Sequence, residues 1–262
     1  MMRSGAVLSA LVLLVASACV HTPTDEEVHI SNSRRALGVE LMTQNRYREA
    51  LGELLEAEKL NPGDPELQYT LGLVYFNGFQ RHDDARQHLS LAMKAKKDYS
   101  EAENLYGVTL MEQERCAEAI PYFERAAANL LYATPEFALQ NQGWCLYKTG
   151  KVEEGLRLLE HAVARAPHLC GAYYWLGQAY AEQGQTDTSI RWFTAFREKC
   201  DGTDLSRFIG AERIADVLYR LGMAHQKQGD TASAREALES CCTRFEKTSV
   251  AVECRKSLDV LP

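Results

Sequence analysis

Small and large apolar residues recur along the chain with a period near 34 residues. The glycines that mark this period follow one another at intervals of 34, 35, 36, 34 and 45 residues, and they are Gly38, Gly72, Gly107, Gly143, Gly177 and Gly222. In most periods a small residue comes twelve positions after the glycine and a large apolar residue sixteen positions after it, as with Ala50 and Leu54. Small side chains let two helices approach closely, and larger ones fill the spaces between them. The pattern therefore predicts two antiparallel helices in each period.

Such a period is typical of the tetratricopeptide repeat (TPR), and it predicts an all-α superhelical solenoid of six helix-turn-helix repeats over residues 31–262. We expect the first repeat to begin at Ser31. The second opens with Asp64-Pro65-Glu66, a capping residue followed by proline and an acid. One inserted residue in this repeat is expected to lengthen its inter-helix turn, over residues 77–84. The longest interval indicates a candidate joint at 200–214, and residues 249–258 are predicted to form a capping helix.

The N-terminus carries the pattern of an export signal, with Arg3 followed by an apolar run over residues 6–15. Ala16-Ser17-Ala18 then precedes Cys19, which allows cleavage by ordinary signal peptidase after Ala18. The stretch also resembles the lipoprotein box of bacteria, although Ala16 stands where leucine is usual. We expect residues 1–18 to be a lipoprotein signal peptide and residues 19–30 to be the lipidated Cys19 with a flexible tether. Val20, in place of aspartate, implies the outer membrane by the same resemblance.

Composition and motifs narrow the classes of function. The chain has 29 basic and 36 acidic residues, for a net charge of −7, and no basic run, which argues against nucleic-acid binding. His21 and His29 lie eight positions apart, and we interpret them as solvated linker residues rather than as metal ligands. The sequence contains no GxSxG, no P-loop and no metal-ligand cluster. We therefore expect no catalytic residue, no cofactor, no metal and no small-molecule substrate.

A family resemblance appears in repeats three and four. The segments that carry it are Asn104-Leu105-Tyr106-Gly107-Val108, residues 119–126, Tyr132-Ala133-Thr134-Pro135 and residues 138–145. These segments resemble the PilF/PilW type IV pilus lipoproteins, and the likeness extends over residues 31–200. Eight cysteines, six repeats and the C-terminal extension most resemble the Tgl lipoproteins, which gliding bacteria need for pilus-dependent social motility.

The resemblance implies a function. It identifies the chain as an outer-membrane lipoprotein that faces the periplasm and acts as a pilotin, a factor for the assembly of the type IV pilus secretin. The implied partners are PilQ-like secretin monomers, together with the membrane through the lipid anchor. A general periplasmic TPR scaffold in envelope assembly is the alternative, and an enzyme is a distant third. Loss of the secretin alone on deletion would favour the first of these.

The cysteines other than Cys19 are predicted to form disulfides, because an exported chain enters an oxidising compartment and no CxxC motif is present. Antiparallel helices bring the start of one beside the end of the next, which pairs Cys170 with Cys200 and Cys116 with Cys145. Either Cys241 or Cys242 would face Cys254, so that one of the two stays free. Buried reduced cysteine is the alternative.

The first helix of each repeat is expected to line the concave side of the solenoid. Counting each glycine as position 8, positions 9 and 12 share one helical face. In repeats one to four these positions are apolar, and the pairs are Val39 and Met42, Leu73 and Phe76, Val108 and Met111, and Trp144 and Tyr147. The apolar run stops at Gln178 of repeat five. We expect these eight residues to form an exposed groove that binds a partner segment. Burial of the same residues as core is the alternative.

Overall fold

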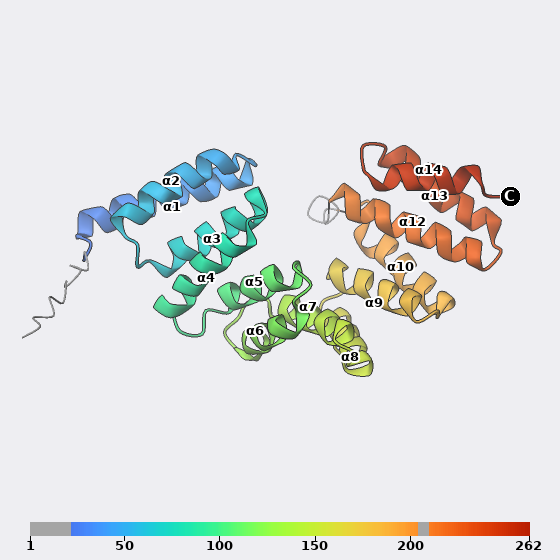
Figure 1. Cartoon of the computed structure of the whole chain (residues 1–262), viewed down its shortest axis with the longest axis horizontal. Helices are drawn as coiled ribbons and strands as arrows, with labels where there is room; N and C mark the ends of the chain where they lie inside the picture. Colours follow the sequence, from blue (N-terminus) through green and yellow to red (C-terminus); the bar gives the residue numbers. More distant parts are fainter. Residues whose placement is uncertain (1–21, 204–209) are drawn as a thin grey trace, which may run out of the picture.

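The structure is a computed structural model in which residues 22–203 and 210–262 are described. These residues form thirteen helices and no strands (Figure 1). The helices are α1 (Asp25–Thr43), α2 (Tyr47–Leu60), α3 (Pro65–Phe79), α4 (His82–Ala95), α5 (Ser100–Met111), α6 (Cys116–Ala128), α7 (Pro135–Lys148), α8 (Val152–Arg165), α9 (Cys170–Glu182), α10 (Thr186–Cys200), α12 (Ala211–Lys227), α13 (Thr231–Arg244) and α14 (Val250–Asp259). No helix of the described part is long and apolar enough to cross a membrane.

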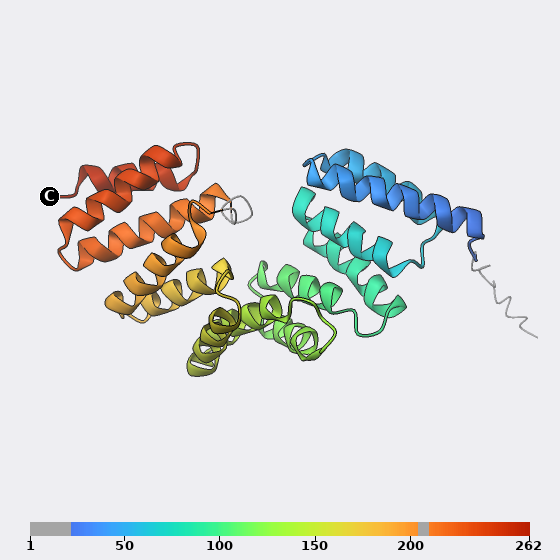
Figure 2. The ribbon, with the colours of Figure 1, turned by 180° about the vertical axis from the view of Figure 1, so that it is seen from behind.

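Consecutive helices pair into six helix-turn-helix repeats, from α1–α2 to α12–α13, and α14 packs against both α13 and α12. The repeats follow an arc whose two arms are formed by the first and last repeats (Figures 1 and 2). The predicted all-α solenoid of six repeats with a C-terminal helix is confirmed.

The marker glycines lie where the two helices of a repeat cross most closely. A Cβ atom on Gly177 would come within 2.5 Å of the Phe193 ring, and one on Gly38 within 2.8 Å of Leu54. The large residue at this contact is fully buried in each repeat, and the set is Leu54, Leu89, Phe123, Leu159, Phe193 and Leu238. The regular spacing of small and large residues in the sequence therefore arises from the same helix–helix contact in each of the six repeats.

The first helices of the repeats lie on the inner side of the arc. Helix α1 contacts α3, α3 contacts α5, α5 contacts α7 and α7 contacts α9, in addition to the contacts inside each repeat. In a curved stack, elements of successive repeats approach one another most closely on the concave side. The side chains that α5, α7, α9 and α12 present away from their partners therefore face a common concave surface.

The first helix begins earlier than predicted. Thr24 caps α1, because its hydroxyl accepts a hydrogen bond from the Glu27 backbone and the Glu27 carboxylate accepts one from the Thr24 backbone. Ser31, at which the first repeat was expected to begin, is buried inside α1 and donates to the Ala57 carbonyl at 3.0 Å. The second half of the expected tether is thus helical. The predicted signal peptide and Cys19 lie outside the described residues.

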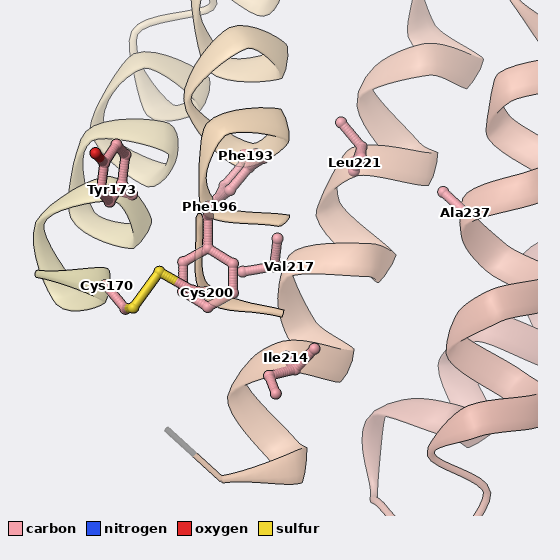
Figure 3. Packing of buried hydrophobic residues seen from close by; sticks show 9 residues of the cluster. All are labelled: Cys170, Tyr173, Phe193, Phe196, Cys200, Ile214, Val217, Leu221 and Ala237. Atoms are coloured by element: carbon pink, nitrogen blue, oxygen red, sulfur yellow. A yellow bond between two sulfur atoms is a disulfide. The ribbon is translucent and has the colours of Figure 1, made fainter. Parts of the chain in front are cut away.

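A continuous core crosses the predicted joint at 200–214. Phe193 and Phe196 of α10 pack against Ile214 and Val217 of α12 (Figure 3). Asp201 and Arg244 add an ion pair in which both guanidinium Nη atoms donate to the carboxylate, at 2.6 and 2.7 Å. Residues 204–209 of the joint lie outside the described part. Repeats five and six are therefore joined by side-chain packing as well as by the chain.

Candidate functional site

The eight residues of the predicted groove do not form one exposed stripe. Val39 is 43% exposed, whereas Leu73 and Phe76 are half-buried and pack against the core residues Leu89 and Leu105. The half-buried residues of the other pairs are also tied to core clusters or to aromatic neighbours, and they are Met42, Val108, Met111 and Tyr147. Much of the stripe thus contributes to the core, because these side chains pack against buried residues of the same repeat or of the next one.

A hollow of about 650 Å³ opens instead on the concave face of repeats three to six. It is bordered by Met111 at the end of α5, Trp144 of α7, Trp175 and Gln178 of α9, and Arg220 of α12. Met111 and Trp144 belong to the predicted groove, and Gln178 is the residue at which that groove was expected to end. Two of the eight residues of the predicted groove therefore border the hollow, and those of repeats one and two do not.

Stacked aromatic rings form the floor of the hollow. The Trp144 and Trp175 ring centroids lie 4.3 Å apart with 18° between the planes, and Tyr147 stacks on Trp144 at 5.4 Å. Tyr174 meets Trp175 edge-on at 4.8 Å. Trp144 is only 7% exposed, whereas Trp175 is half-buried. Such amphipathic rings provide a large apolar contact area at low cost in side-chain entropy.

Basic side chains surround this floor. The Lys148 Nζ atom lies 5.4 Å from the Trp144 ring centroid, and the Arg213 guanidinium carbon lies 5.3 and 5.6 Å from those of Tyr174 and Trp175. Arg220 donates to Asp216 at 2.7 Å, and the Tyr174 hydroxyl donates to the same carboxylate at 2.8 Å. Burial, reinforced by Asp216, raises the pKa of Tyr174 to about 12, so this phenol stays a neutral donor.

Two smaller hollows adjoin the first one and share Arg220 with it. One, of about 260 Å³, lies between α10 and α12 and is bordered by Phe193 and Met223. The other, of about 440 Å³, is bordered by Tyr174, Arg213 and Asp216. The concave surface from α5 to α12 is therefore a connected series of hollows with Arg220 at their junction.

Three disulfides brace this half of the molecule. Cys116 pairs with Cys145, Cys170 with Cys200 and Cys241 with Cys254, and Cys242 is a buried free thiol. The first two are the pairs expected from the repeat positions, and the third selects Cys241 over Cys242. Cys116 itself borders the hollow. Its bridge ties α6 to α7, and so holds the helix that carries Trp144.

Counting only positions 9 and 12 missed five residues of the site, the first of which is Lys148 at the end of α7. Tyr174 and Trp175 occupy positions 5 and 6 of repeat five, and Arg213 and Arg220 lie on α12, after the long interval in the repeat. The two adjacent aromatic residues of α9 were a feature of the sequence that could have indicated the site. The basic residues could be brought to those rings only by the packing of α12 on α10. No group of three potential metal ligands gathers anywhere in residues 22–203 and 210–262.

Two comparisons of sequence bear on this fold. A tetratricopeptide repeat family model matches residues 35–100, 106–169 and 141–202, and a second such model matches residues 216–248. Together these matches extend over most of the chain. No curated protein sequence matches it.

Solved structures share the fold. The crystal structure of PilW, a widely conserved type IV pilus biogenesis factor, superposes with a TM-score of 0.73 at 24% identity, covering 86% of this chain and 97% of PilW. Pseudomonas aeruginosa PilF superposes with a TM-score of 0.68 at 14% identity, covering 88% and 99%. YrrB, a TPR protein with an unusual peptide-binding site, reaches 0.53 at 20% identity, covering 70% and 92%. At these identities the likeness is one of fold.

Proposed function

We propose that this chain, which belongs to the tetratricopeptide repeat family, is a type IV pilus biogenesis protein and the pilotin of a PilQ-like secretin. In this proposal Cys19 is lipidated, and the protein is held at the outer membrane facing the periplasm. Its concave face binds a segment of each secretin monomer, shields that segment from aggregation and brings the monomer to the membrane. It performs no catalysis, in line with the binding role that is usual for TPR scaffolds.

The overlap with PilW carries this proposal. It extends over nearly the whole of both chains, so the two proteins agree in the length of the solenoid as well as in its fold. The TPR fold alone would support little, because one fold serves many functions. The motifs of residues 104–108 and 132–135, together with the lipoprotein-like Cys19, add sequence features that a generic TPR protein does not need.

The hollow on repeats three to six is the best place for the bound segment. Aromatic floors with a few polar groups around them are typical of sites that bind peptides and small ligands. Its volume of about 650 Å³ suits a few side chains rather than a whole domain. Of the predicted groove, Met111 and Trp144 remain part of the site that we propose, and the pairs of repeats one and two contribute mainly to packing.

Deletion of the gene tests this function. Heat-resistant secretin multimers should disappear from the membrane fraction, while unrelated outer-membrane proteins keep their levels. A plasmid copy of the gene should restore the multimers. Loss of several outer-membrane proteins together would favour a general periplasmic scaffold in envelope assembly. Normal multimers and normal piliation in the deletion strain would overturn the proposal.

A further inference from the structure

Two basic side chains have no acidic partner, and they are Lys148 at the hollow and Arg213 at the adjoining hollow of about 440 Å³. Lys148 and Arg213 are both exposed and rest on aromatic rings, and no carboxylate of the described residues forms an ion pair with either. A cation over an aromatic face keeps most of its hydration and its capacity to donate hydrogen bonds. Lys148 approaches the Trp144 ring and Arg213 the Trp175 ring, so each of the two stacked rings carries one free cation.

Most of the other charged side chains near the hollow already form an ion pair or accept hydrogen bonds. Arg115 is held by Glu118 at 2.7 Å, and Arg220 by Asp216. Glu212 accepts hydrogen bonds from the backbone and the hydroxyl of Ser249. Glu114, which follows α5, borders the hollow, and Glu182 of α9 accepts hydrogen bonds from Tyr147 and Gln178. Beside the two tryptophans, Lys148 and Arg213 are therefore cations without an ionic partner, whereas the nearby carboxylates of Asp216 and Glu182 already accept hydrogen bonds.

We infer that the hollow binds a peptide segment in which a carboxylate lies next to an aromatic or aliphatic side chain. The apolar side chain covers the exposed surface of Trp175 and the edge of Trp144. The carboxylate accepts hydrogen bonds from Lys148 or Arg213, which hold it at the border of the hollow. Charge-assisted hydrogen bonds are the stronger class, and they gain further when an apolar contact excludes water beside them.

The occupant is identified as a peptide by the combination of features. A folded domain would need a broad complementary surface, whereas the hollow takes only a few side chains. The two cations lie on separate rings and do not form the continuous basic stripe that a nucleic acid would require. Glu118 at the hollow and Asp216 at the adjoining one would repel a polyanion, but they leave room for one or two carboxylates placed beside Lys148 and Arg213.

This inference rests on the proposed function only in assuming that the concave face binds a protein segment. It names the chemistry of that segment, which the resemblance to pilus proteins does not supply. The test therefore uses peptides whose sequences are not taken from the secretin, so that this inference and the proposed function can fail independently.

The experiment is a selection from a library of randomised 12-residue peptides displayed on phage, carried out with the mature protein. The wild type should enrich peptides with Asp or Glu within two residues of Phe, Tyr, Trp or Leu. The most enriched peptide, made synthetically, should bind on the order of tenfold more weakly when its own carboxylate is changed to the amide. Raising the salt concentration should weaken the same complex, because both cations are exposed.

Variants locate the site. Lys148→Gln with Arg213→Gln should weaken the synthetic peptide on the order of tenfold and remove the acidic preference from the selection. Both side chains are exposed, so the thermal unfolding temperature should not change. Trp175→Leu should weaken binding and leave the acidic preference in place. Arg48→Gln with Lys94→Gln makes the same change of charge on exposed positions of α2 and α4, and it should have no effect.

Enrichment without acidic residues, or an acidic preference that survives the change at Lys148 and Arg213, would overturn this inference. If no peptide is enriched while secretin multimers depend on the protein in cells, the inference fails and the proposed function stands. If acidic peptides bind as described but the secretin assembles without the protein, the site stands and the proposed function fails.

Discussion

At the scale of single residues, the sequence is most informative where two helices touch. The contact of Gly177 with Phe193 is repeated in every repeat with glycine on one side and a large apolar residue on the other. Because the two helices lie at the same separation in each repeat, the contact allows only a small residue on one side and a large apolar residue on the other. These residues therefore recur at a fixed spacing. The residues of the concave face have no such constraint. This is why the helix contacts could be predicted and Tyr174 and Arg213 could not.

The Gly177 contact predicts a large effect of a small side chain. Gly177→Val should lower the free energy of unfolding by about 2–3 kcal/mol, since its Cβ would meet the fully buried Phe193 ring, and overpacking of a core commonly has this cost. Gly52→Ala in α2 is the matched control, because nothing lies within 4 Å of its added Cβ. It should stabilise the protein by about 0.5–1 kcal/mol. Urea denaturation measures both, and equal stability of the two variants would contradict the close-contact account.

His88 predicts a dependence of stability on pH. Its Nδ1 lies 2.7 Å from Gln68 Oε1 and its ring stacks on Tyr75, and burial lowers its pKa despite the nearby Glu58. Below the ordinary pKa of about 6.5, the unfolded chain takes up a proton that the folded protein resists. The free energy of unfolding should therefore fall as the pH drops from about 6.5 toward the lowered pKa of the folded state.

Denaturation at pH 7 and at pH 5 measures this effect. His88→Gln should reduce the loss of stability between the two values, and His161→Gln at an exposed position of α8 should leave it as in the wild type. An equal loss in all three proteins would show that other groups carry the pH dependence.

At the scale of helices and turns, the pairing of elements was predictable, but their ends were less so. The extra residue of repeat two was expected to lengthen the turn, but it lengthens α3, which ends at Phe79. Gln80 then adopts the left-handed conformation, and α4 begins two residues later at His82. Helix α1 extends back to Thr24 through a capping box that lies within the polar N-terminal segment. The ends of helices depend on local hydrogen bonds, and the 34-residue period does not predict these.

The disulfides predict a measurable contribution to stability. Cys170→Ala with Cys200→Ala should lower the free energy of unfolding by about 3–4 kcal/mol, since the bridge closes a loop of 30 residues. Cys242→Ala should change it much less, because this thiol takes part in no bridge. A Cys170–Cys200 variant as stable as the wild type would contradict this contribution.

Peptide mapping checks the pairing itself. After alkylation in denaturant without reductant, Cys242 should be the labelled cysteine among residues 22–203 and 210–262, and the other six should appear in three linked peptides. Alkylation of all seven thiols would refute the bridges.

At the scale of the whole molecule, curvature decides which residues face a partner. The sequence placed the first helices on the concave side, and contacts such as those of α5 with α7 bear this out. The sequence could not predict how deep the groove is at each repeat, because the depth depends on the rotation of each repeat relative to the next. Leu73 and Phe76 therefore turn out to be half-buried, and charges placed there would disturb the core as well as any partner. Trp144 was identified because it occupies position 9 of repeat four, and this repeat borders the hollow.

Lipidation is a prediction about the N-terminal end of the molecule. Labelled palmitate should enter the wild-type protein and fail to enter Cys19→Ser, because the thiol at the cleavage point is the acceptor in the proposed function. The serine variant should also leave the outer-membrane fraction, since the lipid at Cys19 is the anchor in that proposal. Retention of the variant in the outer membrane would show that something other than a lipid at Cys19 holds the protein.

The central claim is that the concave hollow binds the secretin monomer, and photo-crosslinking in cells tests it most directly. A photoreactive phenylalanine analogue at Gln178, a half-buried residue that borders the hollow, should form an adduct of the protein with one secretin monomer. The same analogue at the exposed position of Lys94 on α4 should form none. Adducts with the secretin from position 94 but not from position 178 would contradict the claim and place the partner on the convex face.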